Sequence, residues 1–163
     1  MCAHVPIEAT VVFLISRDRN GDEIVLLGWK SPQASFAAGK LVQPGGKCNP
    51  GESYVDCAVR EYREETGIIL NVSELEFVVD FMSFHEGAPF HHVMMYVARS
   101  YTGEVAASSE MSPEWFLFEK IPYDEMLEGD DEWVPRVLRG EHLIVRKYMY
   151  KEIPSIMEVS LMP

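Results

Sequence analysis

The sequence predicts an α/β fold in which a mixed β-sheet is flanked by helices. Apolar, β-branched runs recur along the chain, an amphipathic helical pattern follows residue 52, and a second helical pattern comes near the end. The chain has 163 residues, 47% of them hydrophobic, which is enough to bury one core. No repeat, low-complexity run or Ser/Gly-rich linker interrupts it. We therefore expect a single domain over residues 1–163.

The chain opens with two apolar runs, at residues 9–16 and 23–29. The Asn20-Gly21 pair between them is a strong turn signal, so we expect a β-hairpin. Residues 31–52 are rich in Gly, Pro and Ser and predict a long loop, which in a compact domain tends to be functional.

A helix is expected directly after this loop. Ser53 is a suitable N-cap, Asp56 stands three residues later, and Gly67 is placed to end the helix in the left-handed conformation. Strands are expected at residues 75–84, 91–101 and 114–120, a second helix at 130–140, and two closing strands at 143–150 and 155–162.

Three glutamates gather on one edge of the first helix, beside its apolar stripe. Glu61, Glu64 and Glu65 repel one another by a few tenths of a kcal/mol per pair, and Glu65 borders the buried side, where the repulsion is worse. A solvated helix surface is the ordinary interpretation of such a cluster. A position at the edge of the core favours a different one, a site for Mg²⁺ or Mn²⁺, which prefer oxygen ligands.

The glutamates belong to a longer pattern of glycines and charged residues at fixed spacing. Its members are Gly46, Glu52, Arg60, Glu61, Glu64, Glu65 and Gly67. This pattern resembles the Nudix box, with Tyr62 where an aliphatic residue is commoner. The resemblance implies the family's α/β/α sandwich, with a mixed β-sheet between helices, and hydrolysis of a nucleoside diphosphate linked to another group.

The resemblance also implies roles for individual residues. Glu61, Glu64 and Glu65 correspond to metal ligands, helped by the backbone carbonyl of Gly45, with Mg²⁺ as the expected ion and Mn²⁺ as a substitute. The residues with structural roles are Gly46, Glu52, Arg60 and Gly67. The carboxylate that accepts the proton of the attacking water varies within the family, and Glu61 is the first candidate.

Beyond the box, residues 10–150 resemble the oxidised-purine nucleoside triphosphatases of 8-oxo-dGTP diphosphatase type. The segments that carry this resemblance are SSEMSPEWFLFEKIPYDEM, DDEWVP, LLGWK and FAAGK. This narrower resemblance implies that Glu110 is a further metal ligand or a catalytic group that orients water. It also implies that Lys30 and Lys47 hold the phosphates.

The base pocket departs from that pattern. Where those enzymes read the purine with an asparagine, two adjacent aspartates and a tryptophan, this chain has Val42, Gly129, Asp130 and Leu127. A shifted alignment recruits Gln43 or Asp131, and aromatic surface is available from Phe36 and Trp133. Of His91 and His92, at most one faces the base, because neighbouring residues of a strand point to opposite faces.

The expected function is Mg²⁺-dependent hydrolysis of a nucleoside triphosphate, possible substrates including 8-oxo-dGTP, to a nucleoside monophosphate and pyrophosphate. The alternatives are a Nudix hydrolase of ADP-ribose or another nucleoside diphosphate derivative, and a non-catalytic nucleotide-binding regulator. A formal net charge of −12 argues against a nucleic-acid partner. No leader or membrane-spanning pattern is evident, so we expect a cytoplasmic monomer or homodimer with its three cysteines reduced.

Overall fold

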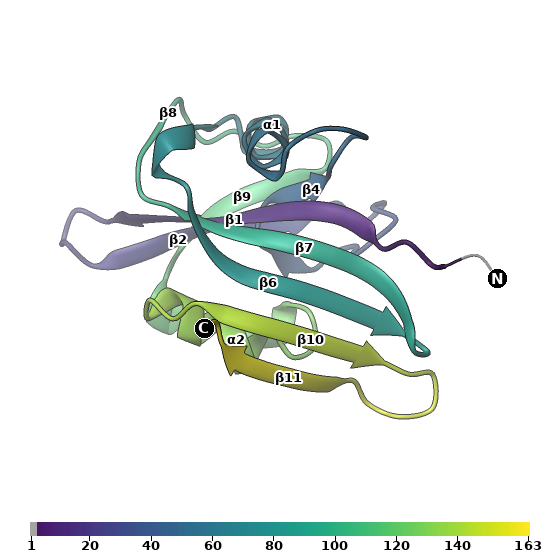
Figure 1. Ribbon diagram of the computed structural model, residues 1–163. Helices are drawn as coiled ribbons and strands as arrows, with labels where there is room; N and C mark the ends of the chain where they lie inside the picture. The colour runs from purple at the N-terminus through teal and green to yellow at the C-terminus, as the bar shows by residue number, and fades with distance from the viewer. Residues whose placement is uncertain (1–2) are drawn as a thin grey trace.

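The computed structural model describes residues 3–163. Its α-helices are α1 (Tyr54–Thr66) and α2 (Asp130–Leu138) (Figure 1). Its strands are β1 (Ile7–Arg17), β2 (Glu23–Lys30), β3 (Leu41–Val42), β4 (Gly45–Lys47), β5 (Ile69–Leu70), β6 (Glu76–His85), β7 (Ala88–Ala98), β8 (Tyr101–Thr102), β9 (Met111–Leu117), β10 (Leu143–Met149) and β11 (Ile156–Leu161).

Nine of the strands in the described part form one mixed sheet. Its order is β11-β10-β6-β7-β1-β2-β3, with β4 beside β1 and β9 beside β2. β1 runs parallel to β7, and β10 runs parallel to β6. β1 and β2 pair as the predicted hairpin, and Gly21 takes the left-handed conformation (φ 85°) in the turn between them.

The two faces of the sheet carry separate cores, as the alternation in β1 requires. Phe13 and Ile15 pack with residues of α2, including Trp133, whereas Val12 and Leu14 pack with residues of α1. In Figure 1, α1 lies at the top of the view, above β1, whereas α2 lies in the lower part, beside β10 and β11. The predicted α/β sandwich, with a mixed sheet between helices, is confirmed.

The helix α1 begins and ends as its capping residues predict. The Ser53 hydroxyl accepts a hydrogen bond from the Asp56 N–H (3.1 Å), and the N–H of left-handed Gly67 (φ 77°) donates to the Arg63 carbonyl (2.9 Å). Tyr62 is fully buried in the core beneath the helix. The unusual residue of the box is therefore a packing residue.

Two expectations about the edges of elements need correction. The long loop before α1 contains the short strands β3 and β4, because its backbone pairs with β2 and β1. The strand expected at residues 114–120 is β9, which starts earlier because Met111 pairs with Lys30 at the end of β2. In both cases the backbone pairing between strands determines where a strand begins and ends, and the alternation of side chains in the sequence does not reveal this pairing.

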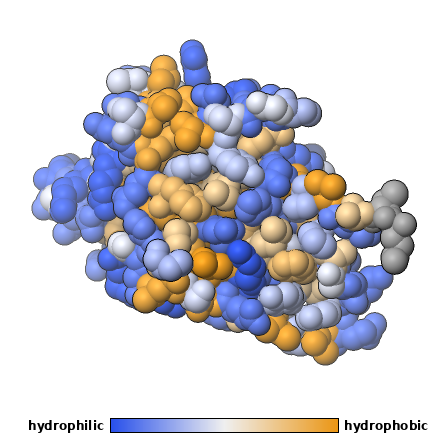
Figure 2. Space-filling model, viewed as in Figure 1, coloured by the Kyte–Doolittle hydropathy of each residue, from blue (hydrophilic) through white to orange (hydrophobic). Residues whose placement is uncertain are grey.

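The surface in the view of Figure 2 mixes apolar residues with hydrophilic ones. Within residues 3–163, neither α-helix is long and apolar enough to cross a membrane.

Candidate active site

A cavity of about 670 Å³ opens beside the sheet, a volume typical of small-molecule sites. Its walls come from one face of β1, β6, β7 and β10, from α2, from the edge of α1 and from the loops before β3 and β9. Eleven residues that the sequence assigned to metal, phosphate or base binding line it, as does the structural glycine Gly46: Lys30, Phe36, Val42, Gly45, Lys47, Glu61, Glu64, Glu65, Glu110, Leu127 and Asp130.

Glu65 is the most buried of the three box glutamates, with 2% of its surface exposed. One carboxylate oxygen accepts a hydrogen bond from the Gly45 N–H (3.0 Å), and the other lies 3.3 Å from the Lys30 ammonium. Burial raises the pKa of Glu65, whereas Gly45 and Lys30 lower it and Glu61 raises it further. The site thus holds a desolvated carboxylate that a cation would stabilise.

Glu61 lies so close to the backbone of Gly46 that a side chain at this position would displace its carboxylate. A Cβ atom at Gly46 would lie 2.3 Å from the Oε2 atom of Glu61. The other carboxylate oxygen of Glu61 accepts from the Arg60 guanidinium (2.7 Å). Gly46 and Arg60 therefore fix the orientation of this carboxylate from two sides.

Arg60 itself is held by Glu52 through a bidentate ion pair, with N–O distances of 2.7 and 2.9 Å. Its second terminal nitrogen also donates to the Lys47 carbonyl (3.0 Å). The hydrogen bonds from Arg60 and from the Asn49 N–H lower the pKa of Glu52 to about 2. This clamp joins the loop before α1 to the helix, so Arg60 positions Glu61 rather than facing the cavity.

Glu64 and Glu110 lie at the rim of the cavity. The Glu64 side chain is 59% exposed and 3.4 Å from Arg60, and Glu110 is exposed directly before β9. The carboxylates of α1 line one cavity, yet their oxygens do not gather within 4.8 Å of one another. Among the described residues, the one group of three possible ligands that close is Cys48, Glu52 and Cys57.

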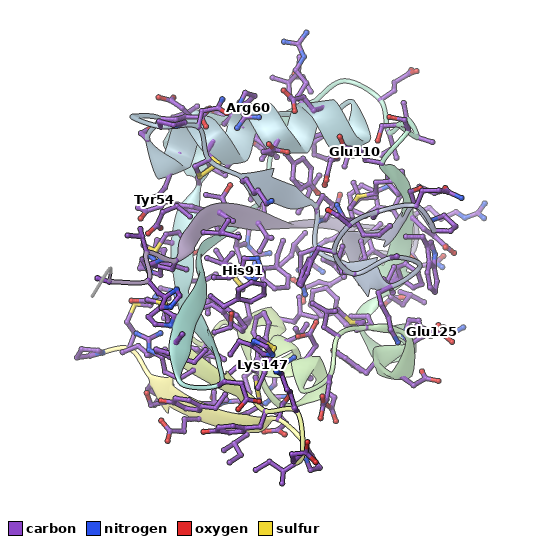
Figure 3. All side chains as sticks on the ribbon, turned by 90° about the vertical axis from the view of Figure 1, so that its right-hand side faces the viewer. Tyr54, Arg60, His91, Glu110, Glu125 and Lys147 are labelled. Carbon is purple, nitrogen blue, oxygen red and sulfur yellow. A yellow bond between two sulfur atoms is a disulfide. The ribbon has the colours of Figure 1, made fainter. Side chains whose placement is uncertain are left out.

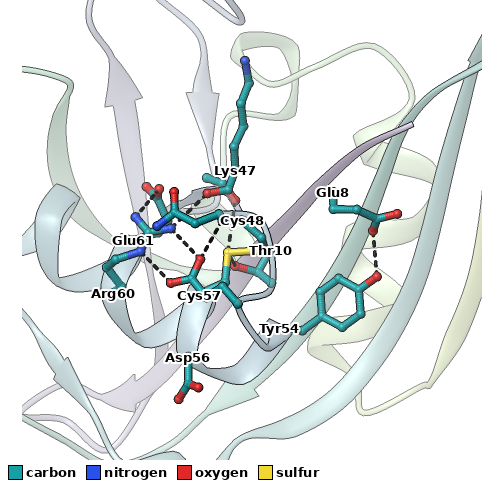
Figure 4. The surroundings of a disulfide bond; sticks show 12 residues. Glu8, Thr10, Lys47, Cys48, Tyr54, Asp56, Cys57, Arg60 and Glu61 are labelled. Atoms are coloured by element: carbon teal, nitrogen blue, oxygen red, sulfur yellow. Dashed lines mark hydrogen bonds and ion pairs between the residues drawn. A yellow bond between two sulfur atoms is a disulfide. The ribbon is translucent and has the colours of Figure 1, made fainter. Parts of the chain in front are cut away.

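Cys48 and Cys57 form a disulfide, which ties the segment after β4 to α1 (Figure 4). The expectation of reduced thiols is wrong for this pair. The Cα atoms are 5.2 Å apart, within the range that a disulfide needs, because β4 packs beside the first turns of the helix. With both sulfurs bonded and Glu52 held by Arg60, this group is not a metal site.

The opposite end of the cavity is formed by buried polar side chains around α2. Asp130 is 4% exposed, its Oδ2 atom has no hydrogen-bond partner among the described residues, and burial raises its pKa to about 7. Gln43 is 7% exposed, and its Nε2 atom is equally without a partner in this part of the chain. The cavity wall here also includes Trp133 and Lys147.

Aromatic rings lie at one side of the cavity. Phe36 is half exposed and its ring centroid is 5.0 Å from that of His91, which also lines the cavity. Burial and the nearby Lys47 lower the pKa of His91. His92 points to the other face, where it contacts Glu8 (2.9 Å). Of these two adjacent strand residues it is His91 that lines the cavity, in keeping with their opposite orientations, and contact of His91 with a base stays a prediction.

Lys147 is not among the residues that the sequence predicts for the site, and Gln43 is predicted only through a shifted alignment. Lys147 continues the inward-facing series of β10 after Leu143 and Val145, both fully buried. A charged residue that interrupts such a series is the signal that points to it. Gln43 offers no comparable pattern, because it lies in an irregular loop between β3 and β4.

Comparisons with known proteins agree with this geometry. The family model described as "NUDIX domain" matches residues 6–137. A protein of Danio rerio named "Oxidized purine nucleoside triphosphate hydrolase" is 35% identical over 124 residues, which cover 74% of this chain and 75% of the relative. A protein of the same name from Mus musculus is 35% identical over 138 residues, covering 84% and 85%.

Solved structures show the same fold. A mutator MutT protein from Bacillus halodurans superimposes with a TM-score of 0.76 at 23% identity, covering 96% of this chain and 99% of that one. The spacing of the glycines and charged residues, the family model and the relatives lead to one conclusion. The chain belongs to the Nudix family and is a Nudix hydrolase.

Proposed function

We propose that this Nudix hydrolase cleaves a nucleoside triphosphate to a nucleoside monophosphate and pyrophosphate, with Mg²⁺ as cofactor and Mn²⁺ as a substitute. The observation that carries the proposal is one cavity with an acidic end at α1 and buried, unpartnered polar groups at its other end. The names of the 35% identical relatives support an oxidised purine nucleotide as the first substrate to test.

The residues at α1 suit a divalent cation. Glu61, Glu64, Glu65 and the Gly45 carbonyl supply oxygen ligands, and Glu110 stands across the rim as a further ligand or a group that orients water. Glu65 is buried and the neighbouring Glu61 raises its pKa further, so this donor set gains from a cation. When bound, the ion neutralises phosphate charge and lowers the pKa of water.

The side chains around this end divide the remaining tasks. Lys30, at the end of β2, and Lys47, at the end of β4, donate to phosphate oxygens. Glu61 accepts the proton of the attacking water, because Arg60 and Gly46 hold its carboxylate in one orientation. Water attacks the β-phosphorus, and the bond from this atom to the oxygen that bridges the α- and β-phosphates breaks. The nucleoside monophosphate is therefore the leaving group, with its base at the base end of the cavity.

The base end holds the nucleobase. Phe36, Val42 and Leu127 supply apolar surface, and Asp130 supplies a hydrogen-bonding group. A buried polar group without a partner discriminates strongly, because a ligand that fails to pair with it leaves it unsatisfied. The enzyme acts on a small nucleotide rather than on nucleic acid, as its net charge of −12 favours.

A product assay tests the proposal. Purified protein is incubated with Mg²⁺ and, separately, 8-oxo-dGTP, 2-hydroxy-dATP, the normal deoxynucleotides and ADP-ribose, and pyrophosphate and orthophosphate are measured separately. Pyrophosphate from a triphosphate is the expected result. Orthophosphate with a diphosphate would contradict the site of attack, and rapid cleavage of ADP-ribose with inert triphosphates would favour the nucleoside diphosphate alternative.

A non-catalytic nucleotide-binding regulator is distinguished by Glu65→Gln. An enzyme loses nearly all turnover in this variant, whereas a protein that only binds shows no turnover in either form and loses some affinity. Turnover of the wild-type protein together with its loss in the variant is the outcome we expect.

A further inference from the structure

The cavity contains a buried lysine, Lys147, to which the proposed function assigns no role. Lys147 of β10 is 9% exposed, and its ammonium donates to the Glu128 carbonyl (2.5 Å). None of the ion pairs among residues 3–163 includes it. An ammonium group has three N–H donors, so two remain for another partner. Burying these two N–H groups without an acceptor costs free energy, and an acceptor on a ligand would offset that cost.

The neighbours of Lys147 restrict what that ligand can be. Lys147 lowers the pKa of Asp130, whose unpartnered oxygen lines the same cavity. In Figure 3, Lys147 lies on one side of His91, whereas Glu110, at the rim of the cavity, and Arg60 lie on the other side. Above about pH 7, where Asp130 is ionised, a phosphate is a poor ligand here because the carboxylate would repel it. The ligand must present an acceptor to the lysine and a donor to the aspartate, side by side.

The edge of a 6-oxopurine has this arrangement. Its O6 atom is an acceptor and its N1–H group, next to it, is a donor, as in guanine and hypoxanthine. A 6-aminopurine places N–H donors at position 6, where the lysine offers only donors and no acceptor. An amino group there leaves the Lys147 donors unpaired.

We propose that Lys147 is a specificity-determining residue that donates to the O6 atom of a 6-oxopurine base, with Asp130 accepting from the adjacent N1–H group. The Gln43 amide, whose Nε2 atom is also without a partner among the described residues, lines the same cavity and offers one more donor to its ligand. This inference rests on the proposed function in that it places a nucleotide in the cavity. It goes beyond it by selecting guanine-type and hypoxanthine-type bases over adenine-type bases.

The test compares dITP with dATP, whose bases differ at N1 and position 6. We expect wild-type protein to have the higher kcat/KM for dITP. In Lys147→Met, which keeps the length of the side chain, kcat/KM for dITP should fall about 10- to 100-fold, as the loss of a hydrogen bond to a charged donor implies, while that for dATP changes less than roughly threefold. Lys147→Gln keeps a neutral donor, so its kcat/KM for dITP should lie between the values of wild type and Lys147→Met. Lys120→Met, at an exposed lysine, is the matched control and should match wild type.

Equal losses for both substrates, or no loss, would overturn the role of Lys147. A titration with dIMP and dAMP, without metal, separates this result from failure of the proposed function. If no triphosphate is cleaved but wild type prefers dIMP and Lys147→Met does not, the proposed reaction fails and the lysine inference stands. If wild type binds the two monophosphates equally, or binds neither, the inference is wrong. Thermal unfolding of each variant verifies that it is folded.

Discussion

Asp130 is expected to make the protein less stable as the pH rises toward neutrality. Burial raises its pKa from 3.8 to about 7, and Lys147 offsets only part of that rise. In the unfolded chain the carboxyl group has an ordinary pKa near 4. Between these two pH values the folded protein keeps a proton that the unfolded chain has lost. The unfolding free energy therefore falls with rising pH across this interval and levels off above about pH 7.

The size of the effect follows from the width of the interval. Each pH unit within it lowers the free energy of unfolding by about 1.4 kcal/mol. Between pH 5 and the plateau near pH 7, the loss is roughly 3 kcal/mol. For a protein of this length that corresponds to a decrease in Tm of roughly 6–12 °C.

The assay compares wild type with Asp130→Asn, which has nearly the same shape and no charge at any pH. Urea unfolding at pH 5, 6, 7 and 8 gives the free energy of unfolding of each protein. In the difference between the two free energies, the contributions of the other titrating groups, Glu65 included, cancel. That difference should shift by about 3 kcal/mol in favour of the variant from pH 5 to pH 8. Asp131→Asn, at the exposed neighbouring position, is the control and should show no such shift. A constant difference for Asp130→Asn would refute the reasoning, because it would mean that Asp130 is ionised throughout.

Three further outcomes are expected. Gly46→Ala should lower kcat about a hundredfold in the product assay, because the added methyl group displaces the Glu61 carboxylate. Circular dichroism of the variant should show that its fold is intact. Glu65→Gln should lower kcat by at least roughly a hundredfold, and a titration should find nucleotide still bound. Reduction of the Cys48–Cys57 disulfide, which spans nine positions, should lower the free energy of unfolding by roughly 3 kcal/mol in urea titrations with and without reductant. The Cys48→Ser/Cys57→Ser variant should not respond to reductant.

The acidic end of the cavity could be predicted because its residues are close together in the sequence. Caps at Ser53 and Gly67 define the limits of α1, and the 3.6-residue period then places Glu61, Glu64 and Glu65 along one edge. The same helix geometry put Glu65 at the border of the core, where it is 2% exposed. Local rules determine all of these positions.

The base end depends on contacts between distant segments, which one sequence does not specify. Gln43 precedes β4, Asp130 begins α2, and Lys147 lies on β10, so only the packing of α2 against the sheet brings them to one cavity. The disulfide has a similar cause. Cys48 and Cys57 are close in sequence, but their approach depends on how the loop before α1 folds back against the helix, and irregular loops carry no period that would reveal it.

The charges of the cavity indicate that the proposed binding of a nucleotide depends on both of its ends. Its lining contains three lysines and five carboxyl groups: Lys30, Lys47, Lys147, Glu61, Glu64, Glu65, Glu110 and Asp130. A triphosphate approaching this surface, on a protein of net charge −12, meets repulsion unless cations accompany it. In the proposed function, the base end contributes attraction that is independent of that repulsion, since hydrogen bonds and apolar contacts would hold a neutral base. A nucleotide held there keeps its phosphates beside the glutamates of α1, so base recognition acts together with the cation to bring like charges to the reacting bond.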